Sequence, residues 1–275
     1  PELILARPPV PRAKTIQMTT PVNNAATILV QPDRAEKWQQ ILADLITEPK
    51  ELLEILELDP GANPLGETGL AQFPLKVPRP FAARMEKGNW HDPLLRQVWP
   101  ALQEADPQPE LVSDPLQEHR FNPAPGILHK YPGRVLLTAA PHCAIHCRYC
   151  FRRHFDYAAN TLSRNQWQQS IARIAADPGI EEVILSGGDP LANSDQQLDW
   201  LLTRLEALPQ LTTVRIHTRL PVVIPQRITT ALVQRLAGSR LRAVLVAHVN
   251  HSRELDQQCH DNFSTLAANS ITLLN

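Results

Sequence analysis

Three of the four cysteines in the 275-residue chain lie within eight positions, at Cys143, Cys147 and Cys150. Thiolates are soft ligands that favour zinc or iron–sulfur clusters. Structural zinc normally takes four protein ligands, and ordinary ferredoxin clusters use four cysteines. The C-x3-C-x2-C spacing therefore suits a cubane cluster in which three irons have a protein ligand and the fourth is free for a small molecule.

Two other ligand sets fit the same residues. A zinc ion could recruit one histidine beside the thiols, from among His142, His146 and His154. A cluster with four cysteines would need Cys259. That thiol lies on a predicted helical stripe with Leu255, Phe263 and Leu266, so we expect it to be buried as a small hydrophobic side chain.

A second motif, "LSGGDP" at 185–190, follows a predicted strand and precedes a predicted helix. Gly187 and Gly188 allow the backbone to approach a ligand without a Cβ in the way. Asp189 adds a carboxylate directly after them. Taken with the cysteines about 40 residues earlier, the turn indicates a ligand site rather than a simple strand exit.

Strands alternate with amphipathic helices in the second half of the chain. Strands are predicted at 134–140, 181–189, 213–219, 243–249 and 271–275, and helices at 163–177, 194–208, 228–238 and 252–269. The first two helices open with capping-box pairs, Ser163 with Gln166 and Ser194 with Gln197. A repeat of about 30 residues is the length of a βαβ unit, so the fold class is α/β, with a full or partial (β/α) barrel.

The first half of the chain does not show this alternation of strands and helices. Residues 1–32 are rich in proline and predict an extended arm. A helix begins after Asp33 as N-cap and a second follows Pro49, after which proline breaks up short helical pieces to residue 128. We therefore predict three parts: the arm at 1–32, an N-terminal helical lobe at 33–128, and the barrel at 129–275.

Composition excludes several classes of partner. The formal net charge is −1, which gives no reason to expect nucleic acid as a partner. No apolar run approaches the roughly 20 residues of a membrane helix, and the N-terminus has no secretory signal. Because clustered thiols stay reduced in the cytosol, we expect a cytoplasmic protein that does not associate with membranes.

The cysteine motif, with Tyr149 just before its last cysteine, resembles that of radical S-adenosylmethionine (SAM) enzymes. In that family the three cysteines hold a [4Fe–4S] cluster whose open iron binds SAM, and the fold is a full or partial barrel. The segments "GILHKYPGRVLL", "CRYCFRRHF", "SGGDPL", "RIHTRLPVVIPQRIT" and "HVNH" are more specifically similar to the lysine 2,3-aminomutase family, which adds pyridoxal phosphate (PLP). Together with "HDPLLRQVWP" at 91–100, "CRYCFRRHF" is most similar to the bacterial branch that serves elongation factor P.

The resemblance implies roles for individual residues. The cluster ligands are Cys143, Cys147 and Cys150. The implied SAM-binding residues are Tyr149, Gly187, Gly188, Asp189, His217, Arg219, His248 and Asn250. The residues implied to bind the PLP phosphate are Lys130, Tyr131 and Arg134. The positive charges of Lys130 and Arg134 suit the phosphate dianion. Arg152 corresponds to the arginine that holds the substrate carboxylate, whereas Arg148 and Arg153 could simply pair with surface acids.

One part of the family pattern has no counterpart in this sequence. The last predicted strand runs into the C-terminus, and none of the six lysines, of which Lys130 is the last, matches the lysine that anchors PLP as a Schiff base. We therefore expect a C-terminally shortened chain that is inactive without the lysine that anchors PLP. Its cluster and SAM sites should be complete and its PLP and lysine sites only half built.

The implied function is an isomerase that converts L-α-lysine to (R)-β-lysine for the modification of elongation factor P. The implied partners are free lysine, a separate lysyl ligase with elongation factor P, a reductant such as flavodoxin or ferredoxin, and a second copy in a homo-oligomer. A catabolic lysine 2,3-aminomutase is the first alternative. A metal-binding or electron-transfer module without SAM chemistry is the second.

Overall fold

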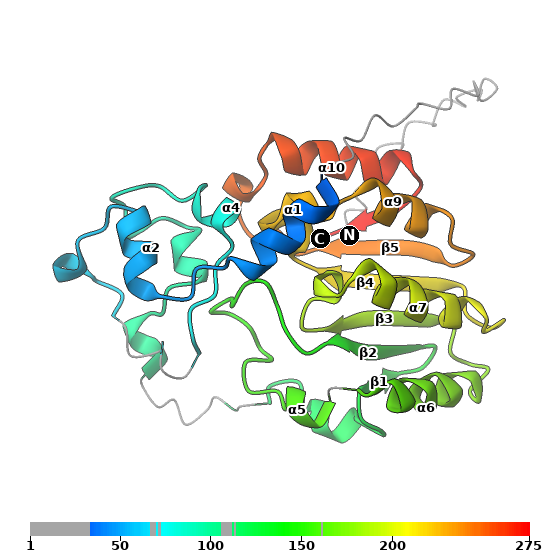
Figure 1. Ribbon diagram of the computed structural model, residues 1–275. Helices are drawn as coiled ribbons and strands as arrows, with labels where there is room; N and C mark the ends of the chain where they lie inside the picture. Colours follow the sequence, from blue (N-terminus) through cyan, green and yellow to red (C-terminus); the bar gives the residue numbers. More distant parts are fainter. Residues whose placement is uncertain (1–33, 67–69, 71–72, 106–111, 113, 161) are drawn as a thin grey trace, which may run out of the picture.

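A computed structural model describes residues 34–66, 70, 73–105, 112, 114–160 and 162–275 (Figure 1). The predicted arm at 1–32 and the N-cap Asp33 lie outside these residues. No helix in the described ranges is long and apolar enough to cross a membrane.

The second half of the chain folds around a six-stranded sheet. Its strands are β1 (Ile127–Tyr131), β2 (Arg134–Ala140), β3 (Glu182–Gly187), β4 (Thr213–Thr218), β5 (Arg242–Ala247) and β6 (Thr272–Leu274). They lie side by side in chain order, and each pair from β2–β3 to β5–β6 is parallel. The sheet is not closed, which confirms the partial (β/α) barrel.

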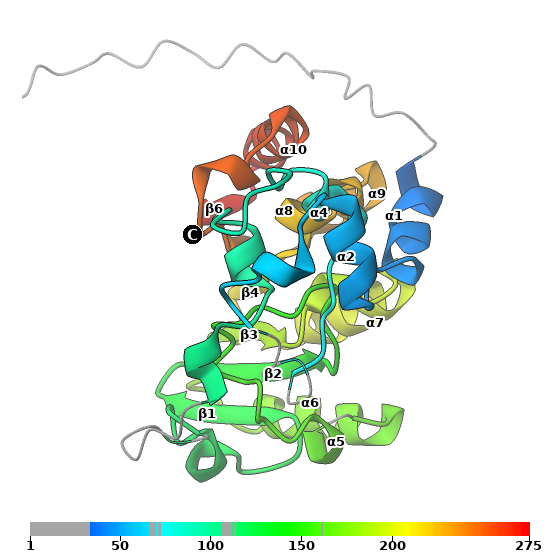
Figure 2. The same ribbon diagram turned by 90° about the vertical axis from the view of Figure 1, so that its left-hand side faces the viewer.

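Helices follow the parallel strands β2 to β5 and cover one face of the sheet (Figures 1 and 2). The long ones are α6 (Arg164–Ala175), α7 (Asp195–Glu206), α9 (Thr230–Ala237) and α10 (Gln257–Ala268). Both predicted capping boxes form, with Ser163 and Ser194 accepting from the backbone three residues later. The helix predicted from 252 instead begins at Gln257, because Asp256 caps it by accepting from the Cys259 N–H at 2.8 Å.

Shorter elements connect these units. They are the helices α5 (Tyr157–Asn160) and α8 (Leu220–Val223) and the 3-10 turns η5 (Pro190–Ala192), η6 (Pro225–Arg227) and η7 (Ser252–Glu254). Proline opens η5 and η6, where its fixed φ suits the first turn and its missing N–H leaves no donor unpaired.

Strand β1 is a feature that the sequence analysis missed. It pairs antiparallel with β2 through a tight turn in which Gly133 has φ +79°, a conformation that glycine adopts without strain. Only Ile127 and Leu128 at its start are buried, and Lys130 and Tyr131 at its end are exposed. A strand with two buried residues has too little apolar alternation to be recognised in the sequence. The sheet thus begins at residue 127.

The N-terminal lobe consists of short helices, as predicted. They are α1 (Arg34–Ala43), α2 (Pro49–Ile55) and α4 (Arg79–Ala82), with 3-10 turns η1 (Pro60–Ala62), η2 (Leu95–Gln97), η3 (Leu102–Ala105) and η4 (Glu118–Phe121). Buried Phe81, Leu94 and Trp99 belong to the same apolar core as the sheet. The lobe is therefore packed onto the barrel rather than tethered to it (Figure 2).

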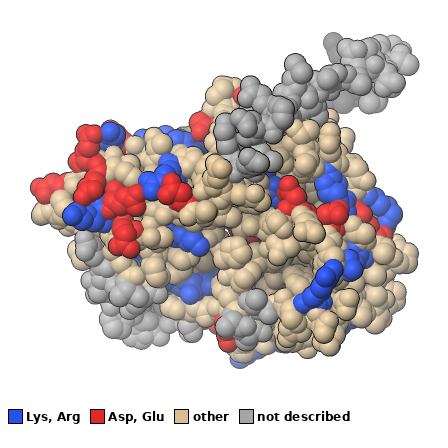
Figure 3. Space-filling model, in the orientation of Figure 1, with Lys and Arg blue, Asp and Glu red and all other residues tan. Residues whose placement is uncertain are grey.

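Charged side chains of both signs are intermixed on the face shown in Figure 3, and many gather over the lobe. Several form ion pairs that link lobe segments. Arg79 binds Asp44 and Glu51, each at 2.7 Å, and Lys87 binds Glu57 at 2.7 Å. Because these pairs are largely exposed, water and salt screen them, and they contribute little to stability.

Candidate functional site

The carboxyl ends of four parallel strands bring most of the predicted site residues to one edge of the sheet. The cysteine loop follows β2, the glycine turn ends β3, His217 and Arg219 lie at the end of β4, and His248 and Asn250 follow β5. Parallel strands place their carboxyl ends together, and (β/α) barrels build their sites there. The topology thus explains why residues more than 100 positions apart in sequence form one site.

The cysteine loop has no regular secondary structure, and the lobe holds its backbone. The His146 N–H donates to the Lys76 carbonyl at 3.0 Å, and the Arg148 N–H donates to the Gln97 carbonyl at 2.8 Å. The His146 ring contacts the Pro74 carbonyl through Nδ1 at 2.8 Å and stacks on Phe73. The lobe therefore fixes the middle of the loop, and it holds the His146 ring against Pro74 and Phe73.

The glycine turn fixes the beginning of the loop from the other side. The N–H of Gly188 donates to Ala140 at 2.8 Å, and that of Asp189 donates to the His142 carbonyl at 2.9 Å. A Cβ on Gly188 would lie 2.3 Å from the His142 carbonyl oxygen, and Gly187 has φ +97°. Both glycines are thus required for the close approach of the two segments.

Asp189 connects the end of β3 to the end of β4. Its carboxylate is buried and accepts from Thr218 Oγ1 at 2.6 Å and from the Arg219 and Leu220 N–H groups at 2.7 and 3.0 Å. Burial raises the pKa of Asp189, and these hydrogen bonds oppose the shift. The carboxylate therefore orders the turn that presents Arg219.

Arg219 stands at the centre of the site. Its Nη1 donates to Cys147 Sγ at 2.7 Å and to Tyr149 Oη at 2.6 Å. The Asn250 amide donates to the same Tyr149 oxygen at 2.6 Å. The structure thus joins four of the predicted residues, from the ends of three strands, in one hydrogen-bonded group.

Two residues of this group were not predicted from the sequence. Gln97 accepts from Arg219 Nη2 and donates to Glu254 Oε1 at 2.5 Å, and Glu254 lies 3.5 Å from the same Nη2. Gln97 lies within "HDPLLRQVWP", a segment already recognised for its family wording, so a signal for it was present. Glu254 was hidden in a stretch predicted as helix.

The three thiols are partly buried and influence one another. Burial is the main cause that raises the pKa of Cys143, and charge on Asp189, Cys147 and Cys150 adds to it. Burial likewise raises the pKa of Cys150. Thiols in such surroundings ionise only when a cation compensates the charge, as a metal centre does. The donor set therefore fits an iron–sulfur cluster.

Among the described residues, no group of three or more His, Cys, Asp and Glu side chains is arranged around a single metal ion. Four ligands of one zinc ion must all approach it to about 2.0–2.3 Å. Thiolates of a cubane each bind a different iron and lie further apart. In the described part of the chain, the cysteine and histidine side chains are thus not arranged as a Cys3His zinc site. Cys259 is fully buried against backbone carbonyls, as expected for a small hydrophobic side chain.

The arginines that flank Cys150 are all paired. Arg152 is buried and forms a two-pronged ion pair with Glu118, at 2.9 and 2.6 Å, and donates to Ser186 Oγ at 3.0 Å. Arg148 and Arg153 both bind Glu104, which lowers the pKa of that carboxyl against the effect of burial. Arg148 and Arg153 are thus paired with an acidic residue, which is the simpler interpretation of these two arginines.

The residues predicted for the PLP phosphate lie elsewhere. Lys130, Tyr131 and Arg134 are at the β1–β2 turn and are exposed. They lie at the amino end of β2, a strand of seven residues, whereas the cysteine loop follows its carboxyl end. At about 3.3 Å per residue the two ends are roughly 20 Å apart. The structure does not bring this trio to the cysteine loop.

Two histidines complete the edge. The rings of His217 and His248 lie 6.1 Å apart, and His217 Nε2 is buried without a hydrogen-bond partner among the described residues. Burial, with His248 as a second cause, lowers the pKa of His217 to about 4. A neutral imidazole with an unpaired nitrogen is suited to bind a polar ligand.

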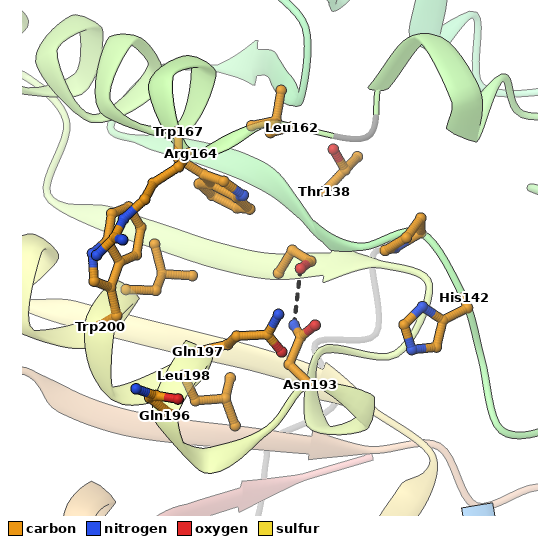
Figure 4. Close-up of a pocket in the computed structure, with 13 residues that line it drawn as sticks. Thr138, His142, Leu162, Arg164, Trp167, Asn193, Gln196, Gln197, Leu198 and Trp200 are labelled. Atoms are coloured by element: carbon orange, nitrogen blue, oxygen red, sulfur yellow. Dashed lines mark hydrogen bonds between the residues drawn. The ribbon is translucent and has the colours of Figure 1, made fainter. Parts of the chain in front are cut away.

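A cavity of about 560 Å³ lies behind the cysteine loop, on the helix side of the sheet (Figure 4). Trp167 of α6 and Trp200 of α7 line it, together with His142 at the loop. The Asn193 amide closes one side by donating to the Ala139 carbonyl at 2.9 Å. The cavity borders the loop but contains none of the Arg219 group.

The sequence of the chain is similar to those of several known proteins. The family model for the radical SAM superfamily matches residues 137–252. L-lysine 2,3-aminomutase of Escherichia coli (strain K12) is 48% identical over 241 residues, which are 87% of this chain and 70% of that protein. Proteins of the same name from Haemophilus influenzae and Buchnera aphidicola are 46% and 38% identical, over 87% and 90% of this chain and 71% and 73% of their own.

Replacing Gly188 by alanine tests the contact between the glycine turn and the loop. We expect Gly188→Ala to lower the free energy of unfolding by about 1–3 kcal/mol, because the Cβ must displace the His142 backbone. Cys143 should then react faster with a thiol-alkylating reagent. The control is Gly179→Ala, where the Cβ meets only the partly exposed side chain of Asp177. Equal unfolding and alkylation in both variants would contradict the contact.

The buried His217 predicts a pH dependence of stability. Its pKa is about 4 in the folded chain and about 6.5 when unfolded, so the unfolded chain binds more protons between these values. The contribution is complete above pH 6.5 and is lost as pH falls towards 4. Urea unfolding at pH 7 and pH 5 should show a smaller difference for His217→Gln than for the unmodified chain. An equal difference in both would refute this assignment.

Proposed function

The chain belongs to the L-lysine 2,3-aminomutase family of radical SAM enzymes, and on that premise we propose that it isomerises L-α-lysine to (R)-β-lysine for the modification of elongation factor P. Membership makes it an isomerase that uses a [4Fe–4S] cluster, SAM and PLP. The observation that carries the proposal is the cysteine loop, held at the carboxyl ends of parallel strands beside the Arg219 group.

When bound, these cofactors supply a carbon radical and an electron sink, which together permit an amino group to move between adjacent carbons. The contribution of the chain is to hold and orient the reactants and to exclude water. We propose that Cys143, Cys147 and Cys150 ligate three irons and leave the fourth to SAM. The support is their shared loop, their burial and their mutual electrostatic influence.

The SAM site is proposed at the same edge of the sheet. Its residues are Tyr149, Gly187, Gly188, Asp189, His217, Arg219, His248 and Asn250. Two buried donors or acceptors there, His217 Nε2 and Arg219 Nε, have no partner among the described residues. An unpaired buried polar atom costs about 1–3 kcal/mol, so a polar ligand at this edge would stabilise the site. Asp189 contributes by ordering the Arg219 turn rather than through a free oxygen.

We propose that Arg152 holds the substrate carboxylate. The Glu118 carboxylate occupies the guanidinium fork in the described structure, which shows that the fork accepts a carboxylate in two-pronged geometry. The substrate would exchange with Glu118. From the family resemblance alone, we propose Lys130, Tyr131 and Arg134 for the PLP phosphate. Lys130 and Arg134 supply accessible cationic groups, at the opposite end of β2 from the cysteine loop.

The biological role is the finer part of the proposal. It rests on the similarity of the segments "HDPLLRQVWP" and "CRYCFRRHF" to the branch of the family that serves elongation factor P. A separate ligase would attach the β-lysine to elongation factor P, and flavodoxin or ferredoxin would supply the electron. We place this chemistry in the bacterial cytoplasm, where clustered thiols remain reduced.

Anaerobic reconstitution tests the cluster assignment. We expect about four iron and four sulfide per chain and an electron paramagnetic resonance signal of the reduced cluster that changes when SAM is added. Cys150→Ala should lose most of this iron, whereas Cys259→Ala should retain it, because Cys259 is buried away from the loop. Tightly bound zinc without iron would reject the proposal.

Modification of elongation factor P tests the biological role. The chain, extended at its C-terminus by a segment that carries the PLP-anchoring lysine, is produced in bacteria that have elongation factor P and its ligase but lack their own 2,3-aminomutase. We expect mass spectrometry of elongation factor P to show the addition of one lysyl group, and none with Cys150→Ala. Free β-lysine without modified elongation factor P would favour the catabolic alternative.

A further inference from the structure

We propose that Gln97 and Glu254 are positioning residues that aim the Arg219 guanidinium at the Cys147 sulfur, and thereby raise the reduction potential of the cluster. The inference rests on the proposed ligation of the cluster by Cys147. It assigns a redox role to a residue of the lobe and to a residue of the segment after β5, neither of which belongs to a recognised ligand motif.

The two arms of the guanidinium have separate partners. Nη1 donates to Cys147 Sγ and Tyr149 Oη, at 2.7 and 2.6 Å, and Nη2 faces Gln97 Oε1 and Glu254 Oε1. The rings of Phe81 and Tyr149 lie 5.2 and 5.7 Å from the guanidinium carbon. Because the fork is planar, fixing Nη2 also fixes the direction in which Nη1 points.

Gln97 links the two charged side chains. Its Oε1 accepts from Arg219, and its Nε2 donates to Glu254 at 2.5 Å, so only one orientation of the amide satisfies both neighbours. Glu254 is fully buried, and its second oxygen accepts from the Asn250 N–H at 3.3 Å. A buried charge needs such partners, and each of these hydrogen bonds restricts the arrangements that the network can adopt.

The backbone of Gln97 is held independently of its side chain. Buried Asp92 accepts from the N–H groups of Leu94 and Leu95, at 2.8 and 2.9 Å, and so fixes the start of η2. The Gln97 carbonyl accepts from the Arg148 N–H in the cysteine loop. A substitution of the Gln97 side chain therefore removes its contact with Arg219 while the lobe continues to hold the loop.

Hydrogen bonds to cluster sulfurs and the charge around them help to set the potential of an iron–sulfur centre. Uptake of one electron from an external one-electron donor increases negative charge on the ligating sulfurs. A cationic N–H directed at Cys147 Sγ stabilises that reduced form more than the oxidised form. Outer partners of a metal ligand tune the centre in the same way, and here Gln97 and Glu254 keep the donor in place.

The test is the midpoint potential of the cluster in the reconstituted full chain. It is titrated anaerobically without SAM, and the electron paramagnetic resonance signal of the reduced cluster is the readout. Gln97→Leu keeps the size and adds no charge, and it removes the amide contacts that hold Arg219 and Glu254 in place. We expect the ratio of reduced to oxidised cluster at a fixed potential to fall about tenfold. For a one-electron couple this corresponds to a midpoint potential that is lower by about 59 mV. Arg219→Lys, which keeps the charge and loses the fork, should shift it in the same direction.

Gln226→Leu is the matched control, because this partly buried glutamine binds Gln258 and is outside the Arg219 group. It should leave the potential unchanged. If Gln97→Leu does not retain the cluster, Gln97→Asn is measured in its place, since the shorter amide cannot reach both neighbours. An unchanged potential in a cluster-loaded Gln97 variant overturns the inference. Failure of the unmodified chain to take up a cluster instead overturns the proposed function.

Discussion

The site depends on how a loop without secondary structure is held in place. Besides the bond from the Cys150 N–H to the Cys147 carbonyl, the backbone of the cysteine loop is hydrogen-bonded to Lys76 and Gln97 in the lobe and to the glycine turn after β3. Buried backbone groups must be paired, so these contacts determine where the loop can run. The position of the thiols is therefore a property of the whole fold, because neither the lobe nor the sheet alone would define it.

The parallel sheet provides the second constraint. It brings the ends of β2 to β5 to one edge, and Asp189 joins two of these ends by accepting from Thr218 and the Arg219 backbone. Arg219 then extends the connection to Cys147 and Tyr149. Structural and functional residues thus form one continuous network, in which a buried carboxylate orders the turn that presents a cation to the cysteine loop.

Much of this arrangement was predictable from sequence because the signals are local. The apolar runs, the capping boxes at Ser163 and Ser194 and the cysteine spacing each lie within one segment. The contacts of Gln97, Glu254 and Glu118 could not be predicted in this way, even though Gln97 lies in a segment with a family resemblance, because their partners are 34 to 157 positions away. Strand β1 was missed for a different reason, since its partner, rather than its own pattern, makes it a strand.

The lobe holds the loop through main-chain carbonyl groups, at Lys76 and Gln97, and this has an evolutionary consequence. Every residue type offers the same carbonyl, so the amino acid at position 76 is free to drift without weakening that contact. What cannot drift is the number of residues between the anchor points. Insertions and deletions, rather than substitutions, are the changes that selection should remove from this part of the lobe.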